Sequence, residues 1–354
     1  MECWTLLACA PRVASRDAVE AEKEGWDGVV LADSQNLAAE VLVEMAYCLA
    51  RTDYLKVAPG VANPVTRHPA VLAGALASLQ AESGGRAVLG LGRGDSSLAH
   101  IGHAPAPVAV FERYLTALQG YLRGEEVPFD AAFAPAGMTP VDALGLGTAP
   151  TGSSLRWLRP SQPKVPVDVA ATGPRVIDLA ARLADAVTFA VGADPRRIGW
   201  AVGRARAARA AAGLDPDGMT FGAYVNIVVH DDVEIAHELV AGGLASTSRF
   251  AVMHGSVTGG ASGQDVDVLE ALHRSYDMNQ HGTPAATHNG ALGVEFTHRN
   301  AIVGPADHCL ARLANLRDQG IRRFQFMEPF DRRGQAGKAH QALVRDVVPE
   351  VQTW

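Results

Sequence analysis

The chain has 354 residues, of which 48% are hydrophobic and 19% are charged. This composition is typical of a globular chain with a large core and argues against a disordered one. The formal net charge of -7 and the lack of a long Lys/Arg run exclude nucleic acid as an expected partner.

The sequence also argues against a membrane partner. No stretch approaches the roughly 20 apolar residues that a membrane span needs, and the first residues lack the pattern of a secretion signal. The four cysteines show no metal-binding spacing, so we expect reduced, mostly buried thiols and a cytoplasmic location. These cysteines are Cys3, Cys9, Cys48 and Cys309.

Short apolar runs alternate along the chain with amphipathic, alanine-rich stretches. The apolar runs predict strands at 3–8, 28–31, 55–58, 87–91, 167–170, 186–190, 221–229 and 323–326. The amphipathic stretches predict helices at 15–23, 38–51, 68–82, 108–123, 174–183, 195–212, 232–241 and 305–319.

Eight strands that are apolar on both faces and alternate with helices indicate a parallel sheet covered on both sides. The length, with no break into two halves, favours an α/β fold of the (β/α)8 TIM-barrel type over an open doubly wound sheet. We expect one domain over residues 1–354 with insertions at about 125–166 and 250–299, where periodicity is lost. Such insertions are commonly lids or binding segments.

The most informative stretch is the fourth apolar run and the turn that follows it. Gly90, Gly92 and Gly94 allow the backbone to approach a ligand closely, and Arg93 can bind a phosphate or carboxylate. The alternate glycine spacing excludes a dinucleotide-binding fingerprint. Gly92, Arg93, Gly94 and Asp95 are therefore candidate residues for binding a phosphorylated cofactor.

A second glycine turn follows the fifth expected strand and begins a helix. It consists of Ala171, Thr172, Gly173, Pro174 and Arg175. A helix amino terminus offers free N–H groups to an anion, so Arg175 and Arg93 can serve one phosphate from neighbouring loops, unless both are simply solvated.

Polar residues also follow the second and third strands. Asp33, Ser34 and Gln35 are either a helix cap or site residues, and one residue can do both. After the third strand, His68 lies at a helix start; without a paired carboxylate, a structural role is the simpler interpretation.

Other chemistries lack a pattern in this sequence. The second insertion carries five histidines, but none has the spacing of a zinc-protease helix, and no metal site is expected. These are His254, His273, His281, His288 and His298. No Gly-x-Ser-x-Gly elbow of an α/β-hydrolase occurs.

Several segments taken together resemble the bacterial luciferase-like oxidoreductases. The segments are 31–36, 60–69, 83–95 and 184–187, and the run from Asn63 to Asp95 is the most specific. The resemblance covers nearly the whole chain and is to the branch that contains deazaflavin enzymes such as methylene-tetrahydromethanopterin reductase.

This resemblance implies a (β/α)8 barrel, often a homodimer, with flavin or deazaflavin across the carboxyl-end face. It places the cofactor phosphate at the two glycine turns, and Gly60, Val61 and Ala62 under the ring. It also implies a non-prolyl cis peptide at Gly60–Val61.

One position departs from the family pattern. Relatives mostly have Asp-His after the second strand, whereas this chain has Asp33-Ser34 followed by Gln35. Serine is no general base near neutral pH unless another group activates it. This disfavours a simple alcohol dehydrogenase and leaves Asp33, a histidine of the second insertion or the substrate itself as the source of protons.

The sequence-based hypothesis is an oxidoreductase that transfers a hydride between coenzyme F420 and a small organic substrate, reducing an activated C=C or C=N bond. Alternatives are an FMN-dependent monooxygenase or reductase supplied by a separate cofactor-reducing enzyme, and a non-catalytic flavin-binding barrel. The acidic tail of F420 would need further cations, for which Arg156, Arg159 and Lys164 are candidates, although they are equally typical of a solvated surface.

Overall fold

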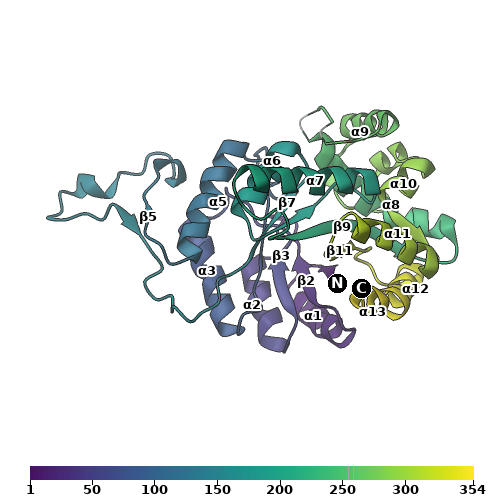
Figure 1. Ribbon diagram of the computed structural model, residues 1–354, viewed down its shortest axis with the longest axis horizontal. Coiled ribbons are helices and arrows are strands. Elements are labelled where there is room, and N and C mark those ends of the chain that lie inside the picture. Colours follow the sequence, from purple (N-terminus) through teal and green to yellow (C-terminus); the bar gives the residue numbers. More distant parts are fainter. Residues whose placement is uncertain (254, 258) are drawn as a thin grey trace.

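The computed structural model describes residues 1–253, 255–257 and 259–354. Parallel strands form its centre, in the order β3-β2-β1-β11-β9-β8-β7-β4, and β10 extends the end of β9 (Figure 1). Their bounds are β1 Glu2–Leu7, β2 Gly28–Leu31, β3 Lys56–Pro59, β4 Leu89–Leu91, β7 Val167–Ala171, β8 Ala186–Phe189, β9 Thr220–Val229, β10 Ile302–Gly304 and β11 Arg323–Met327.

Backbone hydrogen bonds between the two ends of this order close the sheet into a barrel. Val57 N donates to Arg86 O at 3.0 Å, and Ala62 N donates to Gly90 O at 2.9 Å. The bridges on this seam are parallel, as are the ladders between the other strands. The expected TIM barrel is therefore confirmed.

Helices surround the barrel, and several begin at a capping side chain followed by proline. His68 caps the helix that starts at Pro69, and Asp194 caps the one that starts at Pro195. The helices are α1 Val13–Lys23, α2 Val41–Arg51, α3 Pro69–Glu82, α4 Ser96–Ala99, α5 Val108–Leu122, α6 Pro174–Leu183, α7 Pro195–Ala211, α8 Val233–Ser248, α9 Gly263–Ser275, α10 Val294–Asn300, α11 Ala306–Asp318, α12 Gly334–Ala342 and α13 Val348–Gln352.

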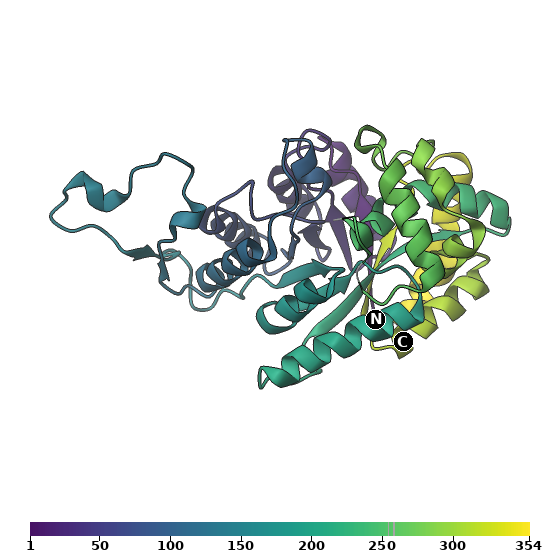
Figure 2. The same cartoon turned by 90° about the horizontal axis from the view of Figure 1, so that it is seen from above.

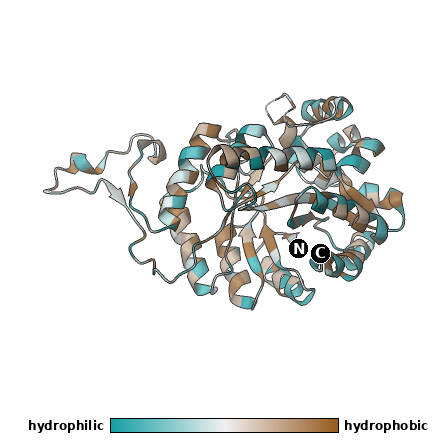
Figure 3. Cartoon of the chain, in the orientation of Figure 1, coloured by the Kyte–Doolittle hydropathy of each residue, from teal (hydrophilic) through white to brown (hydrophobic). Residues whose placement is uncertain are grey.

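The apolar side chains form three clusters. The largest lies between the strands and the helices, and the second joins α8, α9 and α10 to β9 and β10. The smallest fills the barrel with Trp4, Leu6, Val30, Ala58 and Val88. The strands are accordingly hydrophobic, whereas the helices are mixed (Figure 3). All four cysteines are buried free thiols, as expected.

A polar network occupies the amino-terminal end of the barrel interior. Arg323 donates to Asp168 at 3.0 Å and to Glu2 at 2.6 Å, and Thr188 donates to Asp168 at 2.7 Å. The four strands that supply these groups, β1, β7, β8 and β11, begin here, so the network closes the end of the barrel opposite the expected site.

The first insertion, between α5 and β7, is an arm that extends from the barrel (Figures 1 and 2). Its base is a short antiparallel pair, β5 Val127–Pro128 and β6 Gly152–Ser153. Two 3-10 turns follow the first of these strands, at Ala131–Phe133 and Val141–Leu144.

The second insertion differs from the sequence-based expectation in extent and structure. It leaves the barrel at the end of β9 and returns at β10, a strand that the sequence did not predict. It contains α8, α9 and α10, so its described part is largely helical where the sequence showed little periodicity. Asn226 of β9 donates to Thr247 of α8 at 2.7 Å, which places the end of α8 over the carboxyl end of the barrel.

Candidate functional site

The residues expected to form the site follow β2, β3, β4 and β7. These strands are consecutive around the barrel, and their carboxyl ends therefore meet on one face. Ser34 Oγ, after β2, lies 3.1 Å from Ser96 Oγ, after β4, and Asn36 donates to His100 O at 3.1 Å. The fold thus brings the first and third of these loops into contact.

The turn after β3 packs directly into the glycines of β4. The Gly60–Val61 peptide bond is cis, as the family resemblance implied. A Cβ on Gly90 would lie 2.1 Å from Pro59 O, and one on Gly92 would lie 2.7 Å from Val61 Cγ2. These two positions require glycine because the neighbouring turn occupies the space of a side chain.

The two glycine turns bring two arginines together. Gly94 has φ +83°, and the chain then enters α4 at Ser96. Arg93 Nε donates to Ala106 O at 2.6 Å, which fixes its side chain beside the turn. Burial lowers the pKa of Arg93, and the nearby Arg175 guanidinium lowers it further. Two cations held close to each other at such a turn are typical of an anion site.

The start of α6 forms the other side of this position. Gly173 is its N-cap residue, Pro174 is its first residue, and Thr172 Oγ1 donates to Ala190 O at 3.2 Å. No side chain of the described residues caps this helix start. Pro174 has no N–H, and Val176 N donates to Gly173 O at 3.1 Å, so the N–H of Arg175 is the one in this first turn that is left for an anion.

The loop after β2 is organised by an arginine that the sequence analysis did not single out. Arg67 donates to Asp33 Oδ2 at 3.0 Å and also pairs with Glu40. Gln35 donates to Asp33 Oδ1 at 2.6 Å. Burial raises the pKa of Asp33, whereas Arg67 and the hydrogen bonds oppose this rise. Both carboxylate oxygens are thus already engaged, which leaves Asp33 poorly placed to exchange protons with a substrate.

Several buried polar atoms near the site remain without partners, and two of them lie on amide side chains. Gln35 Oε1 and Asn63 Nδ2 are buried and have no hydrogen-bond partner among the described residues. Asn63 Oδ1 accepts from the backbone N–H groups of Val65 and Thr66, so its amide group is oriented. An acceptor and a donor are therefore available for a bound polar ring.

The three cations considered for an acidic cofactor tail lie away from the carboxyl ends of the strands, in keeping with the alternative of ordinary surface charges. Lys164 pairs with Asp185 at 2.5 Å just before β7 and β8 begin, at the amino-terminal end of the barrel. Arg156 and Arg159 are exposed on the segment beside α3, between the arm and that end. This segment runs away from the carboxyl-end face of the barrel, which we call the mouth. It must do so because the chain enters β7 at the amino-terminal end of that strand.

The histidines of the second insertion do not gather around a metal. His254 lies outside the described residues. His281 and His288 both contact Tyr276, whereas His298 lies against His237 at 4.6 Å between ring centroids. His273 lies on α9. In the part of the chain that the structure describes, no group of three His, Cys, Asp or Glu side chains could hold a metal ion.

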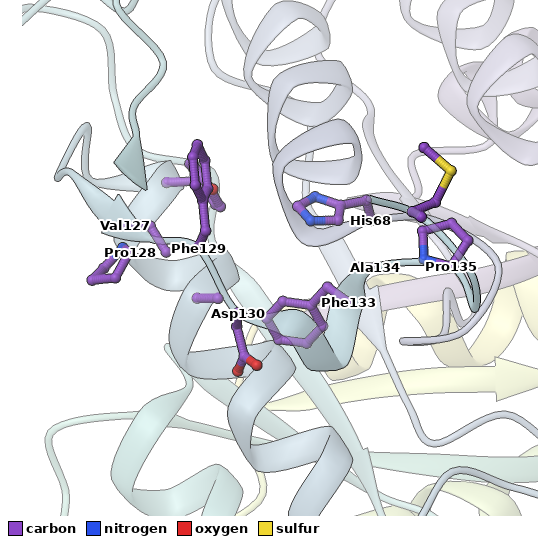
Figure 4. A pocket seen from close by; sticks show the side chains of 11 residues that line it. His68, Val127, Pro128, Phe129, Asp130, Phe133, Ala134 and Pro135 are labelled. Carbon is purple, nitrogen blue, oxygen red and sulfur yellow. The ribbon is translucent and has the colours of Figure 1, made fainter. Parts of the chain in front are cut away.

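A cavity of about 300 Å³ lies beside the arm and away from the strand ends. Phe133 of the arm meets the ring of His68 edge-on at 5.8 Å, on one side of this cavity (Figure 4). Most of its lining comes from the arm residues between Val127 and Met138. It contains none of the expected site residues, so it is a feature of the arm.

Comparison with known proteins was decisive for the family. Residues 8–323 match the luciferase-like monooxygenase family. The chain belongs to this family. The luciferase-like assignment made from the sequence is confirmed.

None of the described helices is both long and apolar enough to cross a membrane.

Individual members of the family are distant from this chain. It is 26% identical over 306 residues to a 5,10-methylenetetrahydromethanopterin reductase of Methanolobus tindarius, covering 85% of each chain. The structure of the F420-dependent tetrahydromethanopterin reductase of Methanopyrus kandleri matches with a TM-score of 0.73 at 20% identity, over 99% of this chain and 100% of that one. The oxygenating constituent of 3,6-diketocamphane monooxygenase from Pseudomonas putida, in complex with FMN, matches at 0.64 and 16%, over 95% and 92%. At 20% and 16% identity, the two structural matches show that these proteins share the fold of this chain.

Proposed function

We propose that this luciferase-like protein is an oxidoreductase that binds coenzyme F420 at the barrel mouth and transfers a hydride between it and an organic substrate. The proposed reaction is the reduction of an activated C=C or C=N bond in the substrate, as expected from the sequence. The observation that carries it is the junction of the β4 glycine turn with the start of α6, where Gly94 has φ +83°, Arg93 is fixed by Ala106 O, and no side chain of the described residues caps the helix. The similarity to methylenetetrahydromethanopterin reductases supports the choice of F420.

The residues present fit such a cofactor. Val61 packs against Gly92, so the turn after β3 lies directly on the glycines of β4, and this backbone can support a ring. Gln35 Oε1 and Asn63 Nδ2 offer an acceptor and a donor for polar atoms of that ring. The glycine turn and the uncapped start of α6 offer backbone N–H groups for the phosphate.

When bound, the deazaflavin supplies the hydride chemistry. The chain would bind and orient it: Gly60, Val61 and Ala62 would support the ring, and the two glycine turns would hold the phosphate. Asp33 holds Gln35 and Arg67 in place through its two carboxylate oxygens. We therefore assign Asp33 a positioning role in place of the titrating role considered from the sequence. Ser34 and Gln35 contribute hydrogen bonds at the reaction zone.

Replacing Arg93 with alanine is expected to weaken F420 binding by about 1.5–3 kcal/mol, roughly a 10- to 150-fold rise in Kd, because a charge-assisted hydrogen bond to the phosphate is lost. Fluorescence titration of the purified protein with F420 measures this. Arg159→Ala removes an exposed arginine far from the mouth and serves as the matched control. Equal affinities for the wild type and Arg93→Ala would remove Arg93 from the site.

A parallel titration with FMN tests the second candidate, an FMN-dependent monooxygenase or reductase that receives reduced flavin from a separate enzyme. The structural similarity to an FMN-bound monooxygenase favours testing it. Tighter binding of FMN than of F420 would favour this second candidate, with oxygen consumption as the next assay. Binding of neither cofactor would contradict both proposals.

We also propose that two copies associate through the arm. The arm has no core of its own, and its exposed apolar residues include Met138, Leu144 and Leu146, of which Leu144 is 67% exposed. Exposed apolar groups that gather on one projecting segment mark an association surface. Since every copy carries the same arm, a second copy is the simplest partner.

Light scattering is expected to give twice the chain mass of 37.2 kDa for the wild type. The double variant Leu144→Asp and Leu146→Asp is expected to be monomeric, because charged side chains oppose burial of the arm. Leu214→Asp, at an exposed leucine outside the arm, is the control and should remain dimeric. A monomeric wild type would exclude the proposal.

A further inference from the structure

A cluster of polar side chains in the second insertion has no part in the function proposed above. Tyr276 Oη lies 2.6 Å from His281 Nδ1. The Arg249 guanidinium lies over the Tyr276 ring, 4.9 Å from its centroid, and His288 stacks on the ring at 4.1 Å. The tyrosine is thus held from several sides, with its hydroxyl group directed at a histidine.

Contacts with the barrel place this cluster at the mouth. Arg249 forms an ion pair with Asp95, in the glycine turn after β4. Tyr276 Oη also donates to Ser246 Oγ, at 3.4 Å, and the adjacent Thr247 accepts from Asn226 of the barrel. Gly243 allows this approach, since a Cβ there would lie 2.9 Å from Asn226 Oδ1. The end of α8 therefore carries Tyr276 to the face on which the cofactor turns lie.

The two residues considered from the sequence as partners of the substrate are already engaged. Asp33 has both oxygens engaged, and the Ser34 hydroxyl pairs with Ser96. Reduction of a carbonyl or an enone needs a proton as well as a hydride, and neither residue is suited to deliver it. The phenol of Tyr276 can donate a proton to a substrate oxygen, and the neighbouring His281 can then reprotonate the tyrosinate.

We propose that Tyr276 is the proton donor for reductions at this site, that His281 returns the proton to it, and that the substrates include carbonyl compounds and enones. The inference rests on the proposed F420-dependent function. The acceptor carbon takes the hydride, and the π electrons move to the carbonyl oxygen of the substrate. That oxygen takes the Tyr276 Oη proton. The tyrosinate then takes the proton from His281 Nδ1, while an acid in the solvent, hydronium or a buffer acid, gives one to Nε2 and leaves as its conjugate base. The ring stays neutral, and the reduction consumes one hydride and one solvent proton.

The surroundings of Tyr276 and His281 keep the phenol protonated and the imidazole neutral, as these proton transfers require. Burial lowers the pKa of His281 to about 4, and the neighbouring Arg249, His100 and His288 act in the same direction. The imidazole is therefore neutral near pH 7. Burial raises the pKa of Tyr276, although Ser246 and Arg249 oppose the rise, so the phenol keeps its proton.

Two hydride acceptors separate proton delivery from hydride transfer. Reduced F420 is the donor, 2-cyclohexen-1-one is an acceptor that needs a proton, and N-methylacridinium is one that needs none. Tyr276→Phe is expected to lower kcat with the enone at least about 100-fold, the usual effect of a lost general acid, and to leave the acridinium rate within about twofold. His281→Asn should give the same selectivity with a smaller loss, about 10-fold. Tyr47→Phe, at an exposed tyrosine of α2, is the control.

Histidine NMR of the protein without cofactor supplies a readout that does not depend on turnover. One ring should stay neutral down to about pH 5 and shift in Tyr276→Phe but not in Tyr47→Phe. Equal losses with both acceptors, no loss with either, a wild type that reduces only the acridinium, or a His281 ring that titrates normally would each overturn the inference. Failure of the wild type to bind F420 is measured separately, and it would overturn the proposed function together with this inference.

Discussion

Replacing Arg323 with methionine is expected to lower the free energy of unfolding by about 3–5 kcal/mol at pH 8. Removal of one partner from a buried ion pair leaves the other charge uncompensated, and that cost sets the size of the effect. Arg323 donates to Asp168 inside the barrel, where Asp168 is 4% exposed, and also to Glu2. Urea unfolding followed by circular dichroism measures the change.

The loss of unfolding free energy in Arg323→Met is expected to increase with pH. Burial raises the pKa of Asp168, and Arg323 is the main group that opposes the rise. In the variant the folded-state pKa stays above the unfolded-state value of about 3.9, so the penalty grows as the pH rises above about 4. The loss should therefore be smaller at pH 5 than at pH 8, and Asp168→Asn added to Arg323→Met should recover part of it. Arg322→Met, at the exposed neighbour, is the control; a similar loss there would contradict the argument.

Stability is expected to depend on pH through His340 of α12. His340 Nδ1 lies 2.7 Å from Glu328, and its Nε2 lies 3.1 Å from Glu24. Burial opposes the charged form, but the hydrogen bonds to Glu24 and Glu328 raise the pKa to about 9 from an ordinary 6.5. The nearby Arg332 slightly opposes the rise. At about 1.4 kcal/mol per pKa unit, the charged imidazole stabilises the fold by roughly 3 kcal/mol.

Because the pKa of His340 is raised in the folded state, its charged form stabilises the fold at low pH and not at high pH. The contribution is complete below about pH 6.5 and is lost as the pH rises through about 9. The difference in unfolding free energy between the wild type and His340→Gln should therefore shrink by roughly 3 kcal/mol between pH 6 and pH 10. His308→Gln, at an exposed histidine of α11, should show little such change. A difference for His340→Gln that stays constant over this range would contradict the assigned charge.

The barrel was predictable because its strands are buried on both faces. Such strands appear as short apolar runs, and the expected strand at 28–31 coincides with β2 while the others differ by a residue or two at their ends. β10 was missed because its three residues pair only with the end of β9 and leave almost no apolar run. In the second insertion α8 was expected at 232–241, whereas α9 and α10 were missed because the stretch 250–299 shows little periodicity.

The sequence by itself determined the barrel, the family and the loops at the strand ends, because these depend on local patterns: apolar runs, glycines that must lack a side chain, and a cis turn at Gly60–Val61. Only the tertiary structure decided which charges meet. Arg67 pairs with Asp33 across 34 positions, and Arg249 reaches Asp95 across 154. Pairs so distant in the chain leave no spacing to detect, since they form only when the closed barrel brings its strand ends and its insertion together.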